Sequence, residues 1–228
     1  MDSAASGQAT AAGERAREPL FYLYLAFFAC AWTAYVWFVY RHVQALGESS
    51  LGYAAANIAM RLAIWVGPAV AYLHFVDRTD VFRYLKLSQG WRRGVAIGLA
   101  LGALLFAGSL LRFGRPHVDP STITWNSVLS TSIGIGFFEE IPFRGLILQK
   151  LAARMNFWTA NAVTALLFAA MHLPGWILLG LFSWPVALNV FAFGFVLGAV
   201  FRFSGSLWSC IVAHSLNDFV AFILFHGR

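Results

Sequence analysis

Long apolar runs alternate with short polar segments along most of the chain. About seven of these runs reach the roughly 20 residues that an α-helix needs to cross a hydrocarbon layer ~30 Å thick. We place them near residues 20–40, 52–76, 94–112, 123–149, 157–179, 185–202 and 206–226. The pattern predicts an all-α fold, a multi-span transmembrane helical bundle with a four-helix core in the C-terminal half.

The polar segments predict how the chain is divided. Residues 1–19 are small and polar, and we expect them to be disordered. Residues 20–122 supply the N-terminal spans, of which the first is expected to be a retained signal anchor. Within them, residues 77–93 mix basic with aromatic and leucine residues, which is typical of an amphipathic connection at a headgroup surface. Residues 123–228 form the C-terminal core.

Composition and charge fit a membrane protein. The chain is 60% hydrophobic and only 11% charged, whereas a soluble domain has about 25% charged residues. Its two cysteines, Cys30 and Cys210, both lie in apolar runs, so neither a disulfide framework nor a cysteine metal cluster is expected. The net charge of +6 is concentrated in membrane-flanking segments. We therefore expect a lipid bilayer and no nucleic acid as partner, with the N-terminus inside and the C-terminus outside.

Few ionisable residues fall inside the predicted spans. Three acidic residues do so, namely Glu139, Glu140 and Asp218, and the spans also contain His172 and His214. A charged side chain at the bilayer centre costs roughly 2.5–3.5 kcal/mol on insertion scales, so such residues normally face a protein interior or a water cavity. These five residues are candidates for a functional site.

Helical spacing separates the roles of the two glutamates. Glu140 and Arg144 are four residues apart, so they share one helix face and are predicted to form an intramembrane ion pair. Glu139 points about 100° away. It is expected to be the less neutralised carboxylate and therefore the candidate general base. Pro142 removes a backbone donor and should kink this helix beside the site.

Two more pairs have the same spacing, Phe168 with His172 and His214 with Asp218, while Asn217 is a second, weaker polar candidate. Each residue taken alone has a structural interpretation, as a packing residue or as polar contact between helices. The same holds for Arg61 in the second span, which can pair with a carboxylate or snorkel. The clustering of deep polar residues in the C-terminal half favours a functional site.

Three motifs carry a family resemblance: Glu139-Glu140-x-x-x-Arg144, Phe168-x-x-x-His172 and His214-x-x-x-Asp218. This series resembles the CPBP family, the CAAX-prenyl-endopeptidase and bacteriocin-processing (Abi) family of intramembrane proteases. The match covers roughly residues 123–226 and includes Gly145 and Leu173-Pro174. The first 120 residues resemble the family only in type.

The resemblance implies an intramembrane endopeptidase of the CAAX type, with residues 123–228 as its catalytic core. Glu139 would activate a water that His172 helps to position, and His214 with Asp218 would stabilise the oxyanion. The supporting residues implied are Glu140, Arg144, Phe168 and Asn217. Many members have asparagine where this chain has Asp218, and a carboxylate donates a hydrogen bond only when it is protonated. The implied substrate is a membrane-associated peptide or protein, such as a prenylated protein, a leader or a C-terminal tail.

The resemblance leaves the cofactor open. A zinc ion held by Glu139, His172 and His214 is chemically reasonable, because two histidines and a glutamate form a known catalytic ligand set. If Glu139 were a zinc ligand, Glu140 would have to serve as the base. We favour a mechanism without a metal. The short loops are typical of a compact bacterial member, which predicts the bacterial inner membrane as its location.

Alternative functions use the same residues. A proton- or cation-coupled transporter could employ deep Glu, Asp and His side chains as a relay. An inactive membrane scaffold or immunity protein could retain them as contacts between helices. A serine dyad of Ser204 or Ser206 with His214 is a weaker third possibility, since the sequence lacks the glycine that a rhomboid-like motif needs at Arg202.

Overall fold

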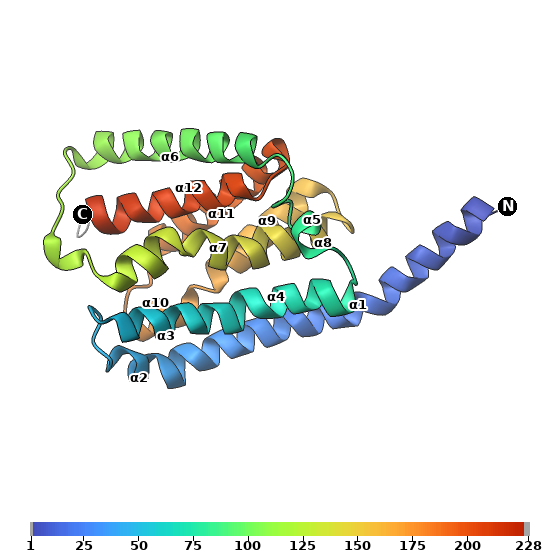
Figure 1. Cartoon of the computed structure of the whole chain (residues 1–228), viewed down its shortest axis with the longest axis horizontal. Coiled ribbons are helices and arrows are strands. Elements are labelled where there is room, and N and C mark those ends of the chain that lie inside the picture. Colours follow the sequence, from blue (N-terminus) through green and yellow to red (C-terminus); the bar gives the residue numbers. More distant parts are fainter. Residues whose placement is uncertain (1, 226–228) are drawn as a thin grey trace.

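The computed structural model describes the backbone of residues 2–225, and their side chains from Glu18 onward. The described residues contain helices and no strands, which confirms the predicted all-α bundle (Figure 1). The first helical run consists of α1 (Asp2–Ala34), the π-helical η1 (Tyr35–Val39) and α2 (Tyr40–Gln44). The second consists of α3 (Leu51–Arg61), η2 (Leu62–Val66), α4 (Gly67–Ala71) and η3 (Tyr72–Val76).

The remaining elements complete the bundle. The short α5 (Val81–Tyr84) precedes the long α6 (Trp91–Phe113), and η4 (Pro120–Thr122) leads into a broken helix. That broken helix consists of η5 (Asn126–Ile133), α7 (Ile135–Glu140), η6 (Ile141–Ile147) and α8 (Leu148–Ala152). The chain ends in α9 (Phe157–Ala170), α10 (Leu173–Leu179), α11 (Trp184–Ser204), α12 (Trp208–Phe219) and η7 (Val220–Leu224).

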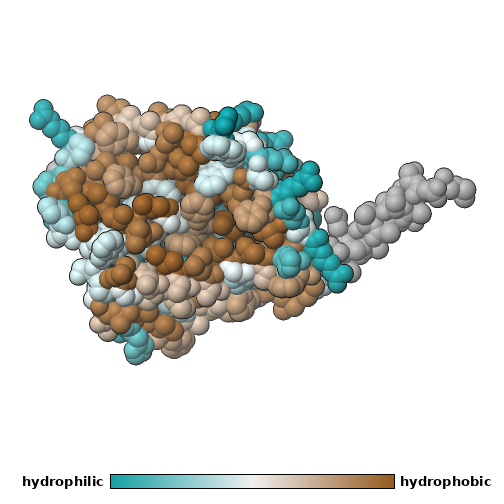
Figure 2. Space-filling model, in the orientation of Figure 1, coloured by the Kyte–Doolittle hydropathy of each residue, from teal (hydrophilic) through white to brown (hydrophobic). Residues whose placement is uncertain are grey.

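The bundle is that of an integral, multi-pass membrane protein. Five described helices are long and apolar enough to cross a membrane: Glu18–Gln44, Leu51–Val76, Trp91–Phe113, Phe157–Leu179 and Trp184–Ser204. The other two predicted spans correspond to the shorter apolar helix Trp208–Leu224 and to the broken helix over 126–152. Hydrophobic residues form a broad band over the visible face, and hydrophilic ones gather toward its two ends (Figure 2). This distribution suits a lipid environment.

The broken helix is the central helix of the bundle. Every side chain from Phe138 to Leu148 is buried, whereas the five long apolar helices present many hydrophobic side chains outward. Charges on a helix that is surrounded by protein avoid the cost of facing lipid. The predicted irregularity beside Pro142 is present, because α geometry ends at Glu140 and a π-helical segment begins at Ile141. Such π-bulges often accompany functional sites.

The glycines of α6 explain its close packing on α12. Gly94, Gly98 and Gly102 are spaced four residues apart and are buried. A Cβ atom at Gly98 would collide with the Val212 side chain and the Ser209 carbonyl of α12. Small residues at this spacing let two helix backbones approach closely, which is a common basis of helix association in membranes.

One end of the bundle gathers the start of the first span, the end of the second span and the end of the broken helix. Lys150 Nζ lies 2.6 Å from Asp77 Oδ2, and Arg154 lies 3.5 Å from the Glu18 carboxylate. The predicted amphipathic connection also packs against this end, because Leu85 is buried there. The C mark lies at the end of the bundle opposite to the one from which the first part of α1 projects, which agrees with an odd number of crossings (Figure 1). Which end faces the cytoplasm stays a prediction.

The N-terminal segment carries the start of the first helix. Helix α1 begins at Asp2 and its first part projects away from the bundle (Figure 1), while the disorder expected for residues 1–19 stays a prediction. Polarity argues against burial but not against a helix, and alanine, which recurs in this segment, is the strongest helix former. The boundaries of the N-terminal and C-terminal parts stay predictions.

Candidate active site

The predicted Glu140–Arg144 ion pair is confirmed. Arg144 Nη1 donates to Glu140 Oε1 at 3.0 Å, and both side chains are fully buried. Arg144 also donates through Nη2 to the carbonyl of Gly194 on α11 at 2.7 Å, and its guanidinium lies 4.7 Å from the centre of the Phe168 ring. The pair is thus held by three helices.

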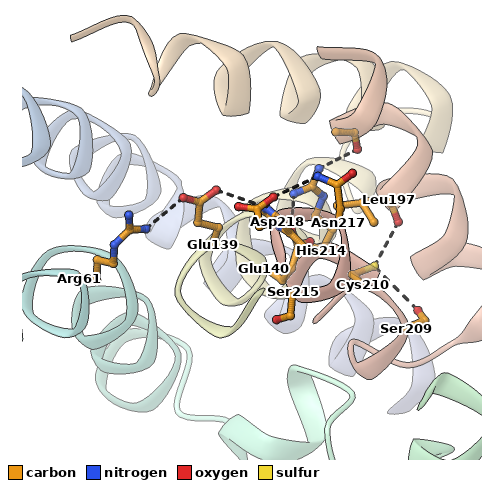
Figure 3. A network of polar contacts seen from close by, with 12 residues as sticks. Arg61, Glu139, Glu140, Leu197, Ser209, Cys210, His214, Ser215, Asn217 and Asp218 are labelled. Atoms are coloured by element: carbon orange, nitrogen blue, oxygen red, sulfur yellow. Dashed lines mark hydrogen bonds and ion pairs between the residues drawn. The ribbon is translucent and has the colours of Figure 1, made fainter. Parts of the chain in front are cut away.

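Glu140 has a second partner that the sequence did not predict. His214 Nδ1 lies 2.6 Å from the same Oε1 atom, across the contact between α7 and α12. An ionised carboxylate only accepts hydrogen bonds, so Nδ1 is the donor and carries a hydrogen. The other ring nitrogen, Nε2, lies 3.9 Å from Glu139 Oε2 and 3.9 Å from Asp218 Oδ1. Glu140 therefore orients His214 so that Nε2 is directed at the other two carboxylates (Figure 3).

Glu139 also has a charged partner, which the spacing did not predict, although it has fewer close partners than Glu140. Arg61 Nη1 donates to Glu139 Oε1 at 3.2 Å, and the Glu139 side chain is only 6% exposed. Arg61 comes from α3 in the second span. The sequence assigned no site residue to the N-terminal spans, although an arginine within an apolar span was itself a signal.

His172 lies at the junction of α9 and α10, where the helix is interrupted just before Pro174. Its Nδ1 lies 2.8 Å from the carbonyl oxygen of Phe168. A carbonyl only accepts, so Nδ1 is the donor, and Nε2 of the neutral ring keeps its lone pair. Trp32 donates to the carbonyl of Met171 at 2.8 Å, which holds the interrupted helix end in place.

Asp218 and Asn217 are adjacent on α12 and contact each other. The Asn217 amide donates to Asp218 Oδ1 at 3.0 Å, so the two side chains do not diverge as much as their 100° helical separation suggested. Asp218 lies on the His214 face of α12, as the four-residue spacing predicts.

One cavity brings these residues together. It has a volume of about 490 Å³, and the predicted site residues that line it are Glu139, Phe168, His172, His214, Asn217 and Asp218. Glu140 and Arg144 are not among the described residues that line the cavity. They lie behind its wall and contact residues that do line it, such as His214. The other walls are mainly apolar and come from α6, α10 and α11, as with Leu101, Trp176 and Phe193. Asn189 of α11 also lines the cavity and was not predicted.

Comparison with known proteins decides the family. Residues 120–220 match the family model described as type II CAAX prenyl endopeptidase Rce1-like. The uncharacterized protein YpbD of Bacillus subtilis (strain 168) is 31% identical over 168 residues, which cover 70% of this chain and 82% of YpbD. The chain belongs to the Rce1-like CAAX endopeptidase family. No solved structure matches it. Membership confirms the resemblance to CPBP proteins and supports a CAAX-type intramembrane protease at the level of the family.

A metal site does not follow from the arrangement of this Rce1-like chain. The zinc ligands considered from the sequence were Glu139, His172 and His214. Both histidines have Nδ1 engaged and Nε2 available, as metal-binding histidines often do. However, within residues 18–225 no three His, Cys, Asp or Glu side chains are grouped closely enough to hold a metal ion. Glu139 is moreover paired with Arg61. The three ligands considered are therefore not gathered as a metal site, the metal requirement stays a prediction, and no step below uses a metal.

Proposed function

We propose that the chain is an intramembrane endopeptidase that hydrolyses a peptide bond in a membrane-associated protein or peptide. The observation that carries this proposal is the single cavity lined by Glu139, His172, His214 and Asp218. Amide hydrolysis needs an activated water, a stabilised oxyanion and a proton for the leaving nitrogen. Residues of these types at one cavity can meet all three needs.

Glu139 is the proposed general base. Its Oε2 atom faces His214, whereas Oε1 is occupied by Arg61, so Oε2 is the oxygen available to a water in the cavity. Glu139 takes one proton from this water as the water oxygen bonds to the scissile carbonyl carbon. The C=O electron pair moves to the carbonyl oxygen, which becomes the oxyanion. Collapse of the intermediate breaks the C–N bond, and the proton on Glu139 passes to the leaving nitrogen.

The two histidines have different proposed roles. The neutral His172 ring presents the lone pair of Nε2 because Nδ1 is bound to the Phe168 carbonyl, so His172 can accept a hydrogen bond from the attacking water and orient it. His214 is held by Glu140 at Nδ1. In its protonated form it carries a hydrogen on Nε2 and can donate to the oxyanion. Asp218, when protonated, and the neighbouring Asn217 amide are the further proposed donors.

The substrate segment is proposed to be largely apolar, which is supported by side chains such as Leu105, Val190 and Phe222 that line the cavity beside the polar groups. This suits a peptide that reaches the site from the membrane. A prenylated protein, a leader or a C-terminal tail are the substrate classes that we expect, and the bacterial inner membrane is the expected location. We also propose that no metal is needed, so a chelator series should leave turnover unchanged.

A cleavage assay tests this function. The purified chain in lipid nanodiscs is incubated with a panel of membrane-associated peptides, and products are identified by mass spectrometry. We expect cleavage by the native chain and none by Glu139→Ala. Proton or cation flux in proteoliposomes without any cleavage would instead favour the transporter, and neither activity would favour the inactive scaffold or immunity protein.

A further inference from the structure

The two oxygens of the Glu139 carboxylate face different side chains. Its Oε1 atom accepts a hydrogen bond from Arg61 Nη1 at 3.2 Å, and its Oε2 atom lies 3.9 Å from His214 Nε2. Figure 3 shows Arg61 on one side of Glu139 and His214 with Asp218 on the other. A carboxylate held at one oxygen has a fixed direction for the second.

Arg61 contacts Glu139 but does not itself line the cavity. Among the described residues, those lining the cavity include Glu139 but not Arg61. The arginine side chain is 20% exposed, and its guanidinium lies 5.9 Å from the centre of the Phe138 ring, next to Glu139 in the sequence. Arg61 therefore reaches the proposed base from behind, where a substrate in the cavity does not contact it.

A polar face on the second span leads to Arg61. Tyr53, Asn57 and Arg61 are spaced four residues apart on α3 and so lie on one face. The Tyr35 hydroxyl donates to Asn57 Oδ1 at 3.3 Å, and the hydroxyls of Tyr40 and Tyr53 lie 3.4 Å apart. These contacts join the first two spans along the face that ends at Arg61, and they fix the helix from which Arg61 extends.

We propose that Arg61 is a positioning residue for Glu139, supplied by the N-terminal spans to the site in the C-terminal core. It holds Oε1 so that Oε2 faces His214 and the cavity, where the attacking water would give up its proton. This inference rests on the proposed function. It assigns a task to a part of the chain that lies outside the matched family region of residues 120–220.

Steady-state kinetics with an internally quenched peptide test the assignment. Arg61→Met keeps the length of the side chain but removes its charge and donors. We expect kcat to fall by about 100-fold, as for a misplaced catalytic group, with KM unchanged. Arg61→Lys should recover a large part of kcat because it retains a donor and the charge. The matched control is Arg41→Met in α2, an exposed arginine, which should behave as the native chain.

A double variant controls for misfolding that an unpaired buried charge could cause. Arg61→Met leaves the buried Glu139 carboxylate unpaired, whereas Arg61→Met combined with Glu139→Gln removes both charges. Neither variant with Glu139→Gln is expected to cleave, so peptide affinity is measured directly. Equal affinity of the double variant and of Glu139→Gln alone is expected, and weaker binding by the double variant would overturn the proposal by showing that Arg61 contacts substrate.

The experiments distinguish an error about the role of Arg61 from an error about the proposed endopeptidase activity. If the native chain cleaves and Arg61→Met has the native kcat, the positioning role is wrong while the proposed function stands. If Arg61→Met changes only KM, the positioning role is likewise wrong and the proposed function stands. If the native chain cleaves none of the panel, the function falls and the inference with it.

Discussion

Glu140 Oε1 accepts hydrogen bonds from both Arg144 Nη1, at 3.0 Å, and His214 Nδ1, at 2.6 Å. One buried oxygen thus links an ion pair on the central helix to a histidine 74 residues later in the chain. The carboxylate neutralises Arg144 and at the same time fixes which nitrogen of His214 faces the cavity. Stability and catalysis should therefore be coupled at Glu140.

Replacing Glu140 should damage both properties. Glu140→Gln leaves the fully buried Arg144 without its counter-charge, which typically costs about 3–5 kcal/mol of folding free energy. We expect a lower unfolding temperature in detergent and little turnover. Adding Arg144→Met to Glu140→Gln should restore much of the stability but not the turnover, because a neutral amide oxygen is a weaker acceptor for His214 Nδ1 than the carboxylate and brings no negative charge to the ring. Recovery of turnover in the double variant would contradict the orienting role of Glu140.

Asp218 offers a test of the oxyanion donor. If Asp218 donates, it must be protonated when it works, so activity should fall as pH rises through its ionisation. Asp218→Asn donates at every pH and should retain activity and extend it to higher pH. Asp218→Ala should lose on the order of 10²–10³ in rate if the role matches that of a single oxyanion donor.

The opposite result at Asp218 has a defined meaning. An inactive Asp218→Asn, with a native chain that stays active at high pH, would show that the carboxylate is needed in its ionised form. It would then serve to orient His214, whose Nε2 lies 3.9 Å from Asp218 Oδ1. The pH profiles of the native chain and of both variants distinguish the two roles.

The glycine face of α6 predicts a contrast between two positions on one helix. Gly98→Leu forces side-chain atoms into the Ser209 carbonyl and Val212 of α12, and overpacking of this kind costs about 1–3 kcal/mol. Because α12 carries His214, turnover should fall as well. Gly108 has open space around it, so Gly108→Leu should leave both thermal unfolding and turnover near native values. Equal behaviour of the two variants would argue against the α6–α12 contact.

The helices and part of the site followed from local patterns. Apolar run lengths predicted the spans, and four-residue spacing predicted that Glu140 meets Arg144 and that His214 and Asp218 share a face, because these relationships lie within one helix. The start of α1 at Asp2 was not predicted, because polarity argues against burial but not against the helix that alanine favours.

Contacts between helices could not be predicted in the same way. Arg61 and Glu139 are 78 residues apart, and His214 and Glu140 are 74 apart, so only the packing of the second span and of α12 on the broken helix brings them together. Spacing left Glu139 without a counter-charge because it compares residues on one helix. Asn189 was passed over for a related reason, since an uncharged amide in an apolar span gives a weak signal until the cavity is seen.

The most direct test of the account compares turnover of the native chain with that of Glu139→Gln, using Glu48→Gln, a change at a loop glutamate, as the control. The amide keeps the shape of the side chain and can still face Arg61, so insertion and unfolding temperature should stay close to native. The account predicts native turnover for Glu48→Gln and no detectable cleavage by Glu139→Gln. Cleavage by a folded Glu139→Gln at the native rate would contradict the central claim that Glu139 activates the attacking water.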